Sequence, residues 1–262
     1  MDGKPAGDST STTRMIAKQR ILILGESPLV EEYASLCHNK GFAVSVRLNP
    51  EFSNVKLPKG LTRAAKPTRN THIALELTNT DLDVKKTNLG QLDKSLSSGT
   101  PILSSSITVT VSEQASWISR PERLIGLGAL PSFLQNELIE FSESSETGKP
   151  TREAAERFSS TIGKKTAFVA DSVGLVLPRI LCMLANEACF AMAENVAAGT
   201  DIDTAMRLGT NYPLGPVEWA QKIGARQVHA VVSALYSCFH EDRYRPSPIL
   251  ALAARRNTFA GL

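Results

Sequence analysis

The first residues that could bind a ligand follow a short apolar run near the N-terminus. Arg20 to Gly25 reads Arg-Ile-Leu-Ile-Leu-Gly, the pattern of a buried parallel strand that ends in glycine. A dinucleotide-binding fold has Gly-x-Gly-x-x-Gly at this place, because the pyrophosphate must approach bare backbone at a helix N-terminus. The sequence here is Gly25-Glu-Ser-Pro-Leu-Val30, which keeps the first glycine alone. Ser27 adds a side chain at the closest approach, and Pro28 removes an N–H donor.

Three acids surround the same loop. Glu26, Glu31 and Glu32 place negative charge where an anion would have to bind. Acidic side chains also stabilise the first turn of a helix through its dipole, and we favour that role for all three.

Proton transfer or metal binding would need histidines or cysteines in suitable clusters. The histidines are scattered, and we expect surface or helix-capping roles for them: His38, His72, His229 and His240. The cysteines lack Cys-x-x-Cys spacing, so we expect buried free thiols in a reducing cytoplasm and no metal site: Cys37, Cys182, Cys189 and Cys238.

The elements that must position these residues alternate between strands and helices in the first part of the chain. Ser27 is predicted as an N-cap and Pro28 as the first residue of a helix that ends at Gly41, and a second strand follows over 42–46. Further strands are predicted near 61–64, over 73–77, from Pro101, and over 124–128, 137–141 and 166–170, with helices over 81–92, 113–118 and 151–161. This order predicts an α/β domain with a mostly parallel sheet.

After Asp171 the pattern changes to helices alone. The long apolar segment 178–198 predicts a central or intersubunit helix. Thr200 is predicted to cap the next helix, and two more are expected over 215–224 and 228–239. We therefore expect a disordered N-terminal tail (1–18), a Rossmann-like dinucleotide-binding domain (19–170) and a helical C-terminal domain (171–262).

Composition excludes several classes of protein. The 262 residues are 42% hydrophobic and 21% charged with a net charge of +3, which is typical of a soluble globular protein. No apolar run reaches the roughly 18–20 residues of a membrane span, so we expect no membrane protein. No basic stripe with stacking aromatics indicates a nucleic-acid partner. The segment 1–13 lacks the apolar core of a signal peptide, which agrees with a cytoplasmic protein.

Long motifs in the helical half carry a resemblance. Asp201-Ile-Asp-Thr-Ala-Met-Arg-Leu-Gly209 is followed by Asn211-Tyr-Pro-Leu-Gly-Pro-Val-Glu-Trp-Ala-Gln-Lys-Ile-Gly224 and by Tyr244-Arg-Pro-Ser-Pro248. Together with Arg120-Pro-Glu-Arg-Leu-Ile-Gly-Leu127, these motifs resemble the L-3-hydroxyacyl-CoA dehydrogenase family over residues 20–255. The resemblance implies an NAD domain followed by a helical dimerisation domain. The activity it implies is the NAD-dependent oxidation of a 3-hydroxyacyl-CoA to the 3-ketoacyl-CoA, a reaction of fatty acid metabolism.

The resemblance also places the family's catalytic residues. The base, a histidine in a Gly-Leu-His-Phe-Phe-Asn-Pro motif, falls on Gly128, which cannot transfer a proton. The glutamate that orients this base is kept as Glu140, and the substrate-contacting serine falls on Thr108 or Ser106. The substrate-contacting asparagine falls on Pro178. Loss of the base removes the roughly 10²–10⁴-fold that general base catalysis contributes.

For the cofactor, the resemblance implies NAD or NADP and selects four residues. Gly25 is the remaining loop glycine, and Glu76 and Lys85 occupy positions that face the nucleotide in relatives, although both could equally be surface charges. Arg47 stands where the family has a ribose-binding acid. An arginine there could accommodate the 2′-phosphate of NADP, but the loss of the glycines favours a solvent-exposed side chain.

Three interpretations follow from these residues. The first is a degenerate family member that keeps the fold, has weak or no hydride chemistry, and binds an acyl-CoA or nucleotide. The second is an active NAD(P)-dependent dehydrogenase with a substituted base, for which Glu140 is the candidate, or with another hydroxy-acid substrate. The third is a non-catalytic binding module that forms a homodimer through the apolar segment 178–198.

Overall fold

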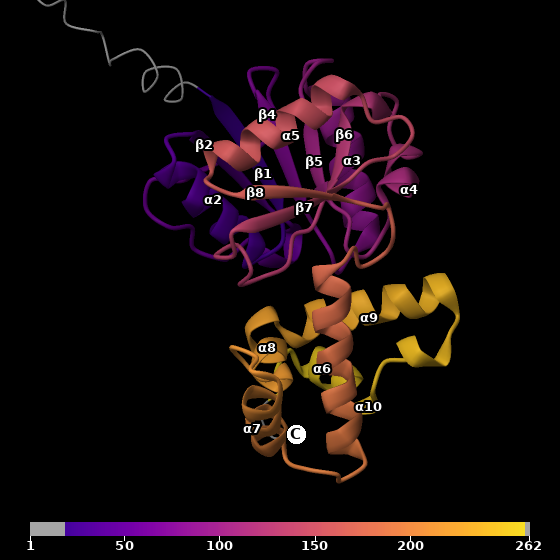
Figure 1. The fold of residues 1–262 in the computed structure, drawn as a ribbon. Helices are drawn as coiled ribbons and strands as arrows, with labels where there is room; N and C mark the ends of the chain where they lie inside the picture. The colour runs from indigo at the N-terminus through magenta and orange to yellow at the C-terminus, as the bar shows by residue number, and fades with distance from the viewer. Residues whose placement is uncertain (1–18, 260–262) are drawn as a thin grey trace, which may run out of the picture.

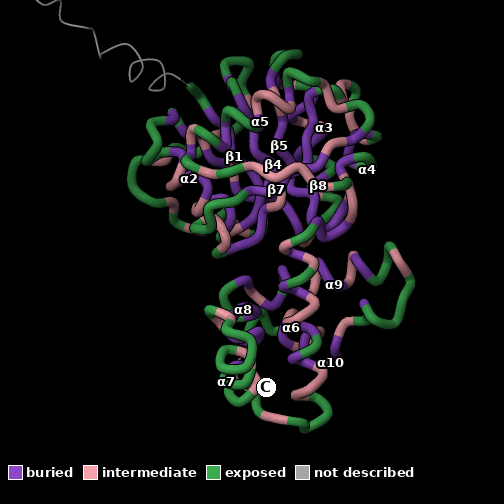
Figure 2. Tube along the Cα trace, viewed as in Figure 1, coloured by how far each residue is buried: buried purple, intermediate pink, exposed green. Residues whose placement is uncertain are grey.

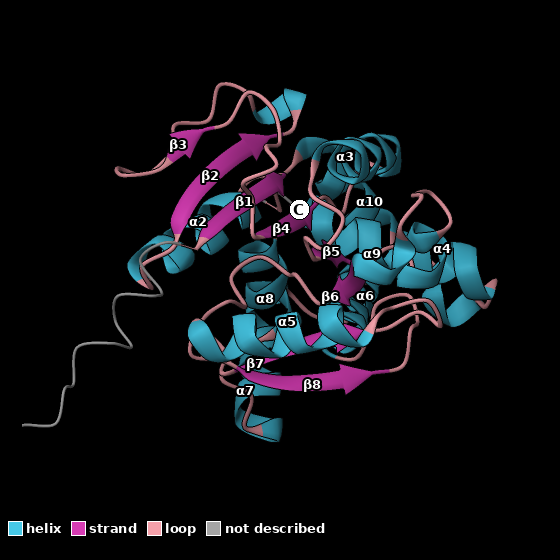
Figure 3. Ribbon diagram, turned by 90° about the horizontal axis from the view of Figure 1, so that it is seen from above, coloured by secondary structure: helices cyan, strands magenta, loops and turns pink. Residues whose placement is uncertain are grey.

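The computed structural model describes residues 19–259 and arranges them in two lobes (Figure 1). The first lobe is built on eight strands: β1 (Arg20–Gly25), β2 (Ala43–Leu48), β3 (Thr62–Arg63), β4 (Ile73–Leu77), β5 (Ile102–Ser105), β6 (Leu124–Leu127), β7 (Leu138–Ser142) and β8 (Lys165–Val169). They form one sheet in the order β3-β2-β1-β4-β5-β6-β7-β8, which can be followed in Figure 3. Only the β6–β7 pair is antiparallel among these described strands. The predicted α/β class with a mostly parallel sheet is confirmed.

Helices cover both faces of the sheet: α2 (Leu29–Asn39), α3 (Leu82–Ser95), α4 (Val111–Ala115) and α5 (Lys149–Thr161). Successive side chains of a strand point to opposite faces, so the Ile-Leu-Ile-Leu run of β1 feeds two cores. Ile21 and Ile23 pack with residues of α2 and α5. Leu22 and Leu24 pack with residues of α3 and α4. The central strands β1, β4, β5 and β6 are accordingly almost fully buried (Figure 2).

The second lobe is helical, as predicted: α6 (Leu177–Ala193), α7 (Gly199–Thr210), α8 (Pro216–Ile223), α9 (Ala225–Phe239) and α10 (Pro248–Arg256). Helix α6 leaves the sheet lobe and runs through the middle of the second lobe, where it contacts α8, α9 and α10 (Figure 1). The apolar core of this lobe includes Ile107, Leu130 and Val173 from loops of the sheet lobe. The two lobes are therefore joined by a shared hydrophobic core.

The start of α2 differs from the prediction. The helix begins at Leu29 and Pro28 is its N-cap residue, so the prediction of a Ser27 cap with Pro28 as the first helical residue is wrong. The Ser27 hydroxyl instead donates a hydrogen bond to Glu31 Oε1, 2.7 Å away, and is not available to the backbone.

Two boundaries in the helical lobe also differ. The predicted helix over 178–198 ends at Ala193, and the left-handed backbone of Asn195 (φ 57°) follows. Thr200 does not cap α7, because the amides of Asp201 and Ile202 donate to the carbonyl of Ala198, which is the N-cap residue.

In the sheet lobe, α4 begins earlier than the predicted 113–118. The Thr110 hydroxyl accepts from the Glu113 amide and caps the helix at that point.

Other predictions concern the surface and the cysteines. Within residues 19–259 no helix combines the length and hydropathy needed to cross a membrane. Cys37, Cys182 and Cys189 are buried free thiols as expected, but Cys238 is exposed, because it lies on the solvent side of α9 near the end of that helix. The predicted disordered tail, residues 1–18, lies outside the described residues.

Candidate functional site

The sheet reverses its strand order at β1, where β2 and β4 lie on opposite sides. Open α/β sheets bind ligands at such a point, beyond the carboxyl ends of the strands. We use the name nucleotide crevice for this place, at residues 25–29, 47–49 and 76–80, because dinucleotide-binding folds hold the nucleotide there. Gly25 stands at its base with φ 141°, and a Cβ there would lie 2.5 Å from the carbonyl carbon of Leu77. Glycine is therefore required at this position by close backbone approach.

Glu26 fills the crevice with its own carboxylate. The residue has an exposed fraction of 0%. Its Oε1 accepts from the backbone N–H of Asn79 at 2.5 Å and from Gln227 Nε2 at 2.9 Å. Its Oε2 accepts from the Thr80 hydroxyl at 2.5 Å. Burial raises the pKa of this carboxyl above its ordinary value, and the hydrogen bonds offset only part of that rise. The predicted role of Glu26 in stabilising the first helical turn is wrong, because its oxygens bind the loop that follows β4 and helix α9.

Glu31 and Glu32 do lie in the first turn of α2, as predicted, and their side chains also bind other groups. Glu31 accepts from Ser27, and both oxygens of Glu32 accept from the amide of Ser132 at 3.1 Å. Glu32 thereby fixes the loop that follows β6.

Asn79 completes a small polar cluster between the lobes. Its side-chain Nδ2 donates to Gln227 Oε1 at 2.9 Å and to the carbonyl of Ala129 at 3.1 Å. Its side-chain Oδ1 accepts from the Ser105 hydroxyl at 2.5 Å. We call Glu26, Asn79 and Gln227 the Glu26 cluster. All three are buried, and they connect the ends of β1 and β4 to α9 of the helical lobe.

A buried ion pair lies next to this cluster. Glu76, in β4, and Lys85, in α3, have side-chain exposures of 0% and form a salt bridge. Lys85 also donates to the carbonyl of Thr78 at 2.8 Å, and Asn88 donates to Glu76 at 3.2 Å. The interpretation of Glu76 and Lys85 as surface charges is wrong, because the crossover from β4 to α3 brings both into the sheet lobe.

Arg47 adds the outer layer of the same network. It is half-buried, and its guanidinium donates to Gln91 Oε1 at 2.6 Å and to Asn88 Oδ1 at 3.0 Å. The prediction of a solvent-exposed arginine is wrong, because two amide side chains of α3 bind it.

These residues do not fit a bound dinucleotide. A pyrophosphate needs exposed backbone N–H groups and space free of negative charge at the start of the helix after β1. Leu29 and Val30 are fully buried there, and the Glu26 carboxylate lies in the crevice. The polar groups around it are already bound to one another.

Glu140 caps a helix. Its two oxygens accept from the backbone amides of Val176 at 3.1 Å and Leu177 at 2.9 Å. Amides at the start of a helix such as α6 have no acceptor within the helix itself. The Gly128 amide donates to the Glu140 carbonyl at 2.8 Å, so the two residues lie side by side. A Cβ at position 128 would lie 3.2 Å from the Glu140 Cβ and 3.3 Å from Leu175 Cδ1. A larger side chain at position 128 would have to displace these neighbours.

Pro178 lies across from Gly128. Both line a cavity of about 30 Å³, together with Glu140 and Leu177. A space of this size holds about one water molecule. The structure therefore brings Gly128, Glu140 and Pro178 together around one small cavity.

Thr108 and Ser106, the two alternatives for the substrate hydroxyl, have different surroundings. Ser106 is fully buried and lies 3.2 Å from the hydroxyl of Ser142. Thr108 lines a large cavity between the lobes and donates to the carbonyl of Asn79 at 3.0 Å. The geometry favours Thr108 as the residue that can meet a ligand.

We call this cavity the interdomain cleft. It has a volume of about 1030 Å³ and lies between the loop that leads into α4 on one side and helices α9 and α10 on the other. His229 of α9 lines it and is half-buried, so the expected surface role is wrong for this histidine, while His38, His72 and His240 are exposed. Arg226 and Arg255 line the same wall, and no motif in the sequence singles them out. An arginine on either helix is equally typical of a helix face that contacts solvent.

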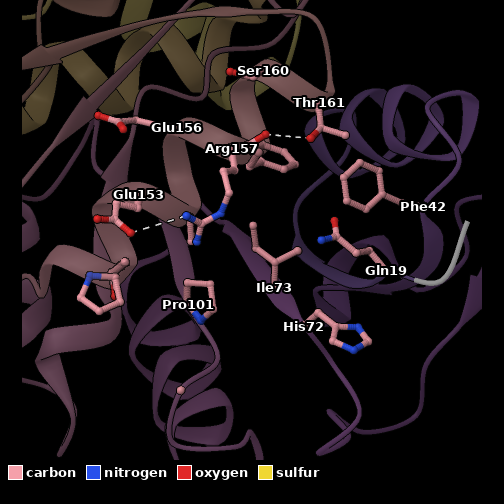
Figure 4. A pocket seen from close by; sticks show the side chains of 15 residues that line it. Gln19, Phe42, His72, Ile73, Pro101, Glu153, Glu156, Arg157, Ser160 and Thr161 are labelled. Carbon is pink, nitrogen blue, oxygen red and sulfur yellow. Dashed lines mark hydrogen bonds and ion pairs between the residues drawn. The ribbon is translucent and has the colours of Figure 1, made fainter. Parts of the chain in front are cut away.

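A second cavity, of about 690 Å³, lies at the other end of the sheet (Figure 4). Its lining includes Ile73 and Pro101, where strands begin, and one face of α5. Arg157 pairs there with Glu153 at 3.6 Å, and His72 accepts from the Arg20 amide at 2.9 Å. The cavity lies away from the carboxyl ends of the strands.

No metal site was found in the described part of the chain. Residues 19–259 contain no group of three His, Cys, Asp or Glu side chains placed to hold a metal ion.

Comparison with known families places the chain. The family model described as 3-hydroxyacyl-CoA dehydrogenase, NAD binding domain, matches residues 30–172, and the model of the C-terminal domain matches residues 174–260. The chain belongs to the 3-hydroxyacyl-CoA dehydrogenase family. The resemblance noted in the sequence is confirmed. The first match begins at Val30, after the loop in which Glu26 replaces the bare backbone of a dinucleotide site.

Individual members of the 3-hydroxyacyl-CoA dehydrogenase family support the same assignment. A 3-hydroxybutyryl-CoA dehydrogenase of Clostridioides difficile is 31% identical over 71% of this chain, and the chain covers 66% of it, just under two thirds. A probable 3-hydroxybutyryl-CoA dehydrogenase of Bacillus subtilis is 26% identical over 88% of this chain and 90% of its own length. The crystal structure of (S)-3-hydroxybutyryl-CoA dehydrogenase from Ralstonia eutropha superposes with a TM-score of 0.74 at 25% identity, covering 91% of this chain and 94% of that one.

Proposed function

We propose that this member of the 3-hydroxyacyl-CoA dehydrogenase family has lost the NAD-dependent oxidation of 3-hydroxyacyl-CoA and binds an acyl ligand between its two domains, residues 19–170 and 171–262. The observation that carries the proposal is the state of Glu140. Both of its oxygens accept from backbone amides of α6, beside a glycine at position 128.

The reaction needs a base for the hydroxyl proton, an anion that orients the base, and a hydride acceptor. With Gly128 there is no imidazole for Glu140 to orient. Glu140 is also the candidate substitute base, but its oxygens are engaged at the start of α6 and lie at a cavity of about 30 Å³. The structure therefore offers no support for an active enzyme with Glu140 as base.

The nucleotide crevice supports the same proposal. NAD is the cofactor that the matched family domain is described as binding. In this chain the Glu26 cluster stands in the place of the pyrophosphate, and the guanidinium of Arg47, which could otherwise meet the 2′-phosphate of NADP, is bound by two amides. Neither NAD nor NADP fits these residues.

The interdomain cleft supports a retained ligand. Its volume of about 1030 Å³ is sufficient for an acyl group with part of a thioester arm. The relatives named above are 3-hydroxybutyryl-CoA dehydrogenases. We therefore propose an acyl-CoA as the ligand class and a role in fatty acid metabolism in the cytoplasm.

We also propose a homodimer that forms through the helical lobe. Helix α6 and the residues before it expose apolar side chains: Val176 is 48% exposed and Ile180 is 53% exposed. Apolar residues grouped on one side of a helix favour association with a second copy.

A turnover assay tests the proposal. Purified protein would be mixed with acetoacetyl-CoA and NADH or NADPH, with the Clostridioides difficile relative as the positive control. We expect turnover at least about 10²-fold below that of the control, because the general base is missing. Turnover in the usual range of roughly 1–10³ s⁻¹ would contradict the proposal.

A further inference from the structure

We propose that Glu26 acts as a pH-sensitive latch between the two lobes: the neutral carboxyl holds the start of helix α9 against the sheet lobe, and the charged carboxylate loosens this junction. The inference goes beyond the proposed function, because the latch needs no ligand and does not depend on whether the chain has lost turnover. It gives the Glu26 cluster a conformational role in addition to its position in the nucleotide crevice.

One amide side chain carries the contact between the lobes at this place. Gln227 is the third residue of α9, and its Nε2 donates to Glu26 Oε1 at 2.9 Å while its Oε1 accepts from Asn79 Nδ2 at 2.9 Å. Both ends of the amide are therefore bound, by residues that lie 201 and 148 positions earlier in the chain. All three residues are buried. A change in the charge of Glu26 thus acts directly on a bond that joins the end of β1 to α9.

The Glu26 carboxyl has hydrogen-bond donors but no counterion. Its donors are neutral groups: the Asn79 backbone amide, the Thr80 hydroxyl and the Gln227 side-chain amide. Among residues 19–259 no lysine, arginine or histidine forms an ion pair with Glu26. A buried carboxylate without a cation is unfavourable, because burial removes the hydration of its charge.

The charges on the neighbouring strand and helices do not supply that counterion. Burial raises the pKa of Glu26, and the charge of Glu76 on β4 raises it further. Lys85 on α3 is bound to Glu76 in their salt bridge, and Arg226 on α9 pairs with Glu51 at 3.4 Å. Both cations near the junction are therefore engaged with other acids.

The remaining titratable groups of α2 and α9 are directed elsewhere. Glu31 accepts from the hydroxyl of Ser27. Glu32 accepts from the amide of Ser132, and burial raises its pKa as well. His229 lines the interdomain cleft, and burial lowers its pKa, so it is neutral in the same range of pH.

The neutral form of Glu26 keeps the hydrogen bonds of the cluster. Oε1 is then the carbonyl oxygen and still accepts from Asn79 and Gln227, while the O–H at Oε2 donates to the Thr80 hydroxyl oxygen, 2.5 Å away. The charged form is stabilised by water, which reaches the buried carboxylate when the junction opens. The closed junction therefore becomes less stable relative to the open one as the pH rises from 4.5 through the raised pKa.

Other bonds between the lobes do not involve Glu26, so we expect the opening to be local. The Ser132 hydroxyl donates to the carbonyl of Lys222 at 3.0 Å, and Glu140 accepts from the first amides of α6. The apolar core that the lobes share also remains. The movement is confined to the start of α9, which forms one wall of the interdomain cleft.

Amide hydrogen exchange, followed by NMR between about pH 4.5 and pH 8, tests the latch. The Asn79 N–H donates to Glu26 itself, and the Val228 N–H, in the first turn of α9, donates to the Gly224 carbonyl at 3.1 Å. After correction for the intrinsic exchange rate, we expect the protection of both amides to fall together as the pH rises, by up to about tenfold per pH unit. Low concentrations of urea should leave this protection unchanged, since a local opening exposes little surface.

Two variants of the loop after β1 separate Glu26 from its neighbours. In Glu26→Gln the new amide accepts at Oε1 and donates to Thr80 at Nε2, as the neutral acid does, but it cannot ionise. We expect the corrected protection of both amides to be independent of pH in this variant. Glu31→Gln is the matched control and should keep the pH dependence, because Glu31 accepts from Ser27 within the sheet lobe.

Gln227→Leu separates a latch between the lobes from an effect confined to the sheet lobe. Leucine cannot bond with Glu26 or Asn79, so we expect the Val228 amide to lose its pH dependence while the Asn79 amide keeps it. Three results would overturn the inference: protection of Val228 that is independent of pH in the unmodified protein, a pH dependence that persists in Glu26→Gln, or one that persists at Val228 in Gln227→Leu.

Discussion

The nucleotide crevice and the interdomain cleft lie on two sides of the same loop after β4, and they differ in the burial of their polar side chains. In the crevice the charged and amide side chains are buried and bound to one another, as Glu76 and Lys85 illustrate. In the cleft the polar groups line open space, and Arg226 and Arg255 are exposed. A satisfied buried network is stable without a ligand, whereas polar groups that face open space remain accessible to one.

Helix α9 contributes to both places from adjacent turns. Gln227 points into the crevice and binds Glu26, while Arg226 and His229 line the cleft. The same helix thus packs against the nucleotide crevice and forms one wall of the interdomain cleft.

The largest effect is expected in the crevice, from Lys85→Met. This change leaves the Glu76 carboxylate buried without its cation, which costs about 3–5 kcal/mol of unfolding free energy. Urea unfolding measures it. The control is Lys86→Met, because Lys86 is exposed and lies over the Trp117 ring at 4.8 Å, a contact worth about 1 kcal/mol or less. Similar losses of unfolding free energy for both variants would show that the buried ion pair contributes no more to stability than the exposed lysine.

A smaller effect is expected from Gln227→Ala, which separates the Glu26 cluster from the helical lobe. The change removes the bonds to Glu26 and Asn79 at 2.9 Å each and leaves buried polar atoms without partners. We expect a loss of about 1–3 kcal/mol in urea unfolding. Gln221→Ala, on the exposed side of α8, serves as control and should change little. A Gln227→Ala protein as stable as this control would argue against a bond between the lobes at this place.

The smallest effect is expected in the pH dependence of stability. Burial raises the pKa of Glu26 above 4.5. Between pH 4.5 and this raised pKa, the native state therefore holds a proton that the unfolded chain has released. The unfolding free energy contributed by this group therefore falls as the pH rises from 4.5 through the raised pKa, by at most about 1.4 kcal/mol per pH unit. Glu26→Gln should flatten this part of the profile. A profile identical to that of the unchanged protein would show that Glu26 does not titrate in this range.

The sequence was sufficient for the parts of the fold that depend on local pattern. The continuous apolar run of β1 predicted a buried strand, and Asp81 predicted the start of α3, where its carboxylate does accept from the amides of Asp83 and Val84. The helical motifs identified the family. The motif spacing also selected Gly128, Glu140 and Pro178, which line one small cavity in the structure.

Side-chain partners distant in sequence could not be predicted. Glu26 precedes a helix, and an acid there is equally typical of a residue that stabilises the helix dipole; its partner Gln227 follows 201 residues later. Arg47 was misplaced for the same reason, because Gln91 and Asn88 approach it only once α3 packs on the sheet. His229 and Arg255 come together through the packing of α9 on α10, which no local spacing indicates.

The most direct test of the central claim, that the chain's own carboxylate has replaced the cofactor's pyrophosphate, is a calorimetric titration of NAD⁺ into the unmodified protein. We predict no saturable heat up to about 1 mM NAD⁺, because Glu26 is buried in the crevice and already bound by Asn79, Thr80 and Gln227. Saturable binding at micromolar concentration would contradict it, since the pyrophosphate could then enter the crevice despite that carboxylate.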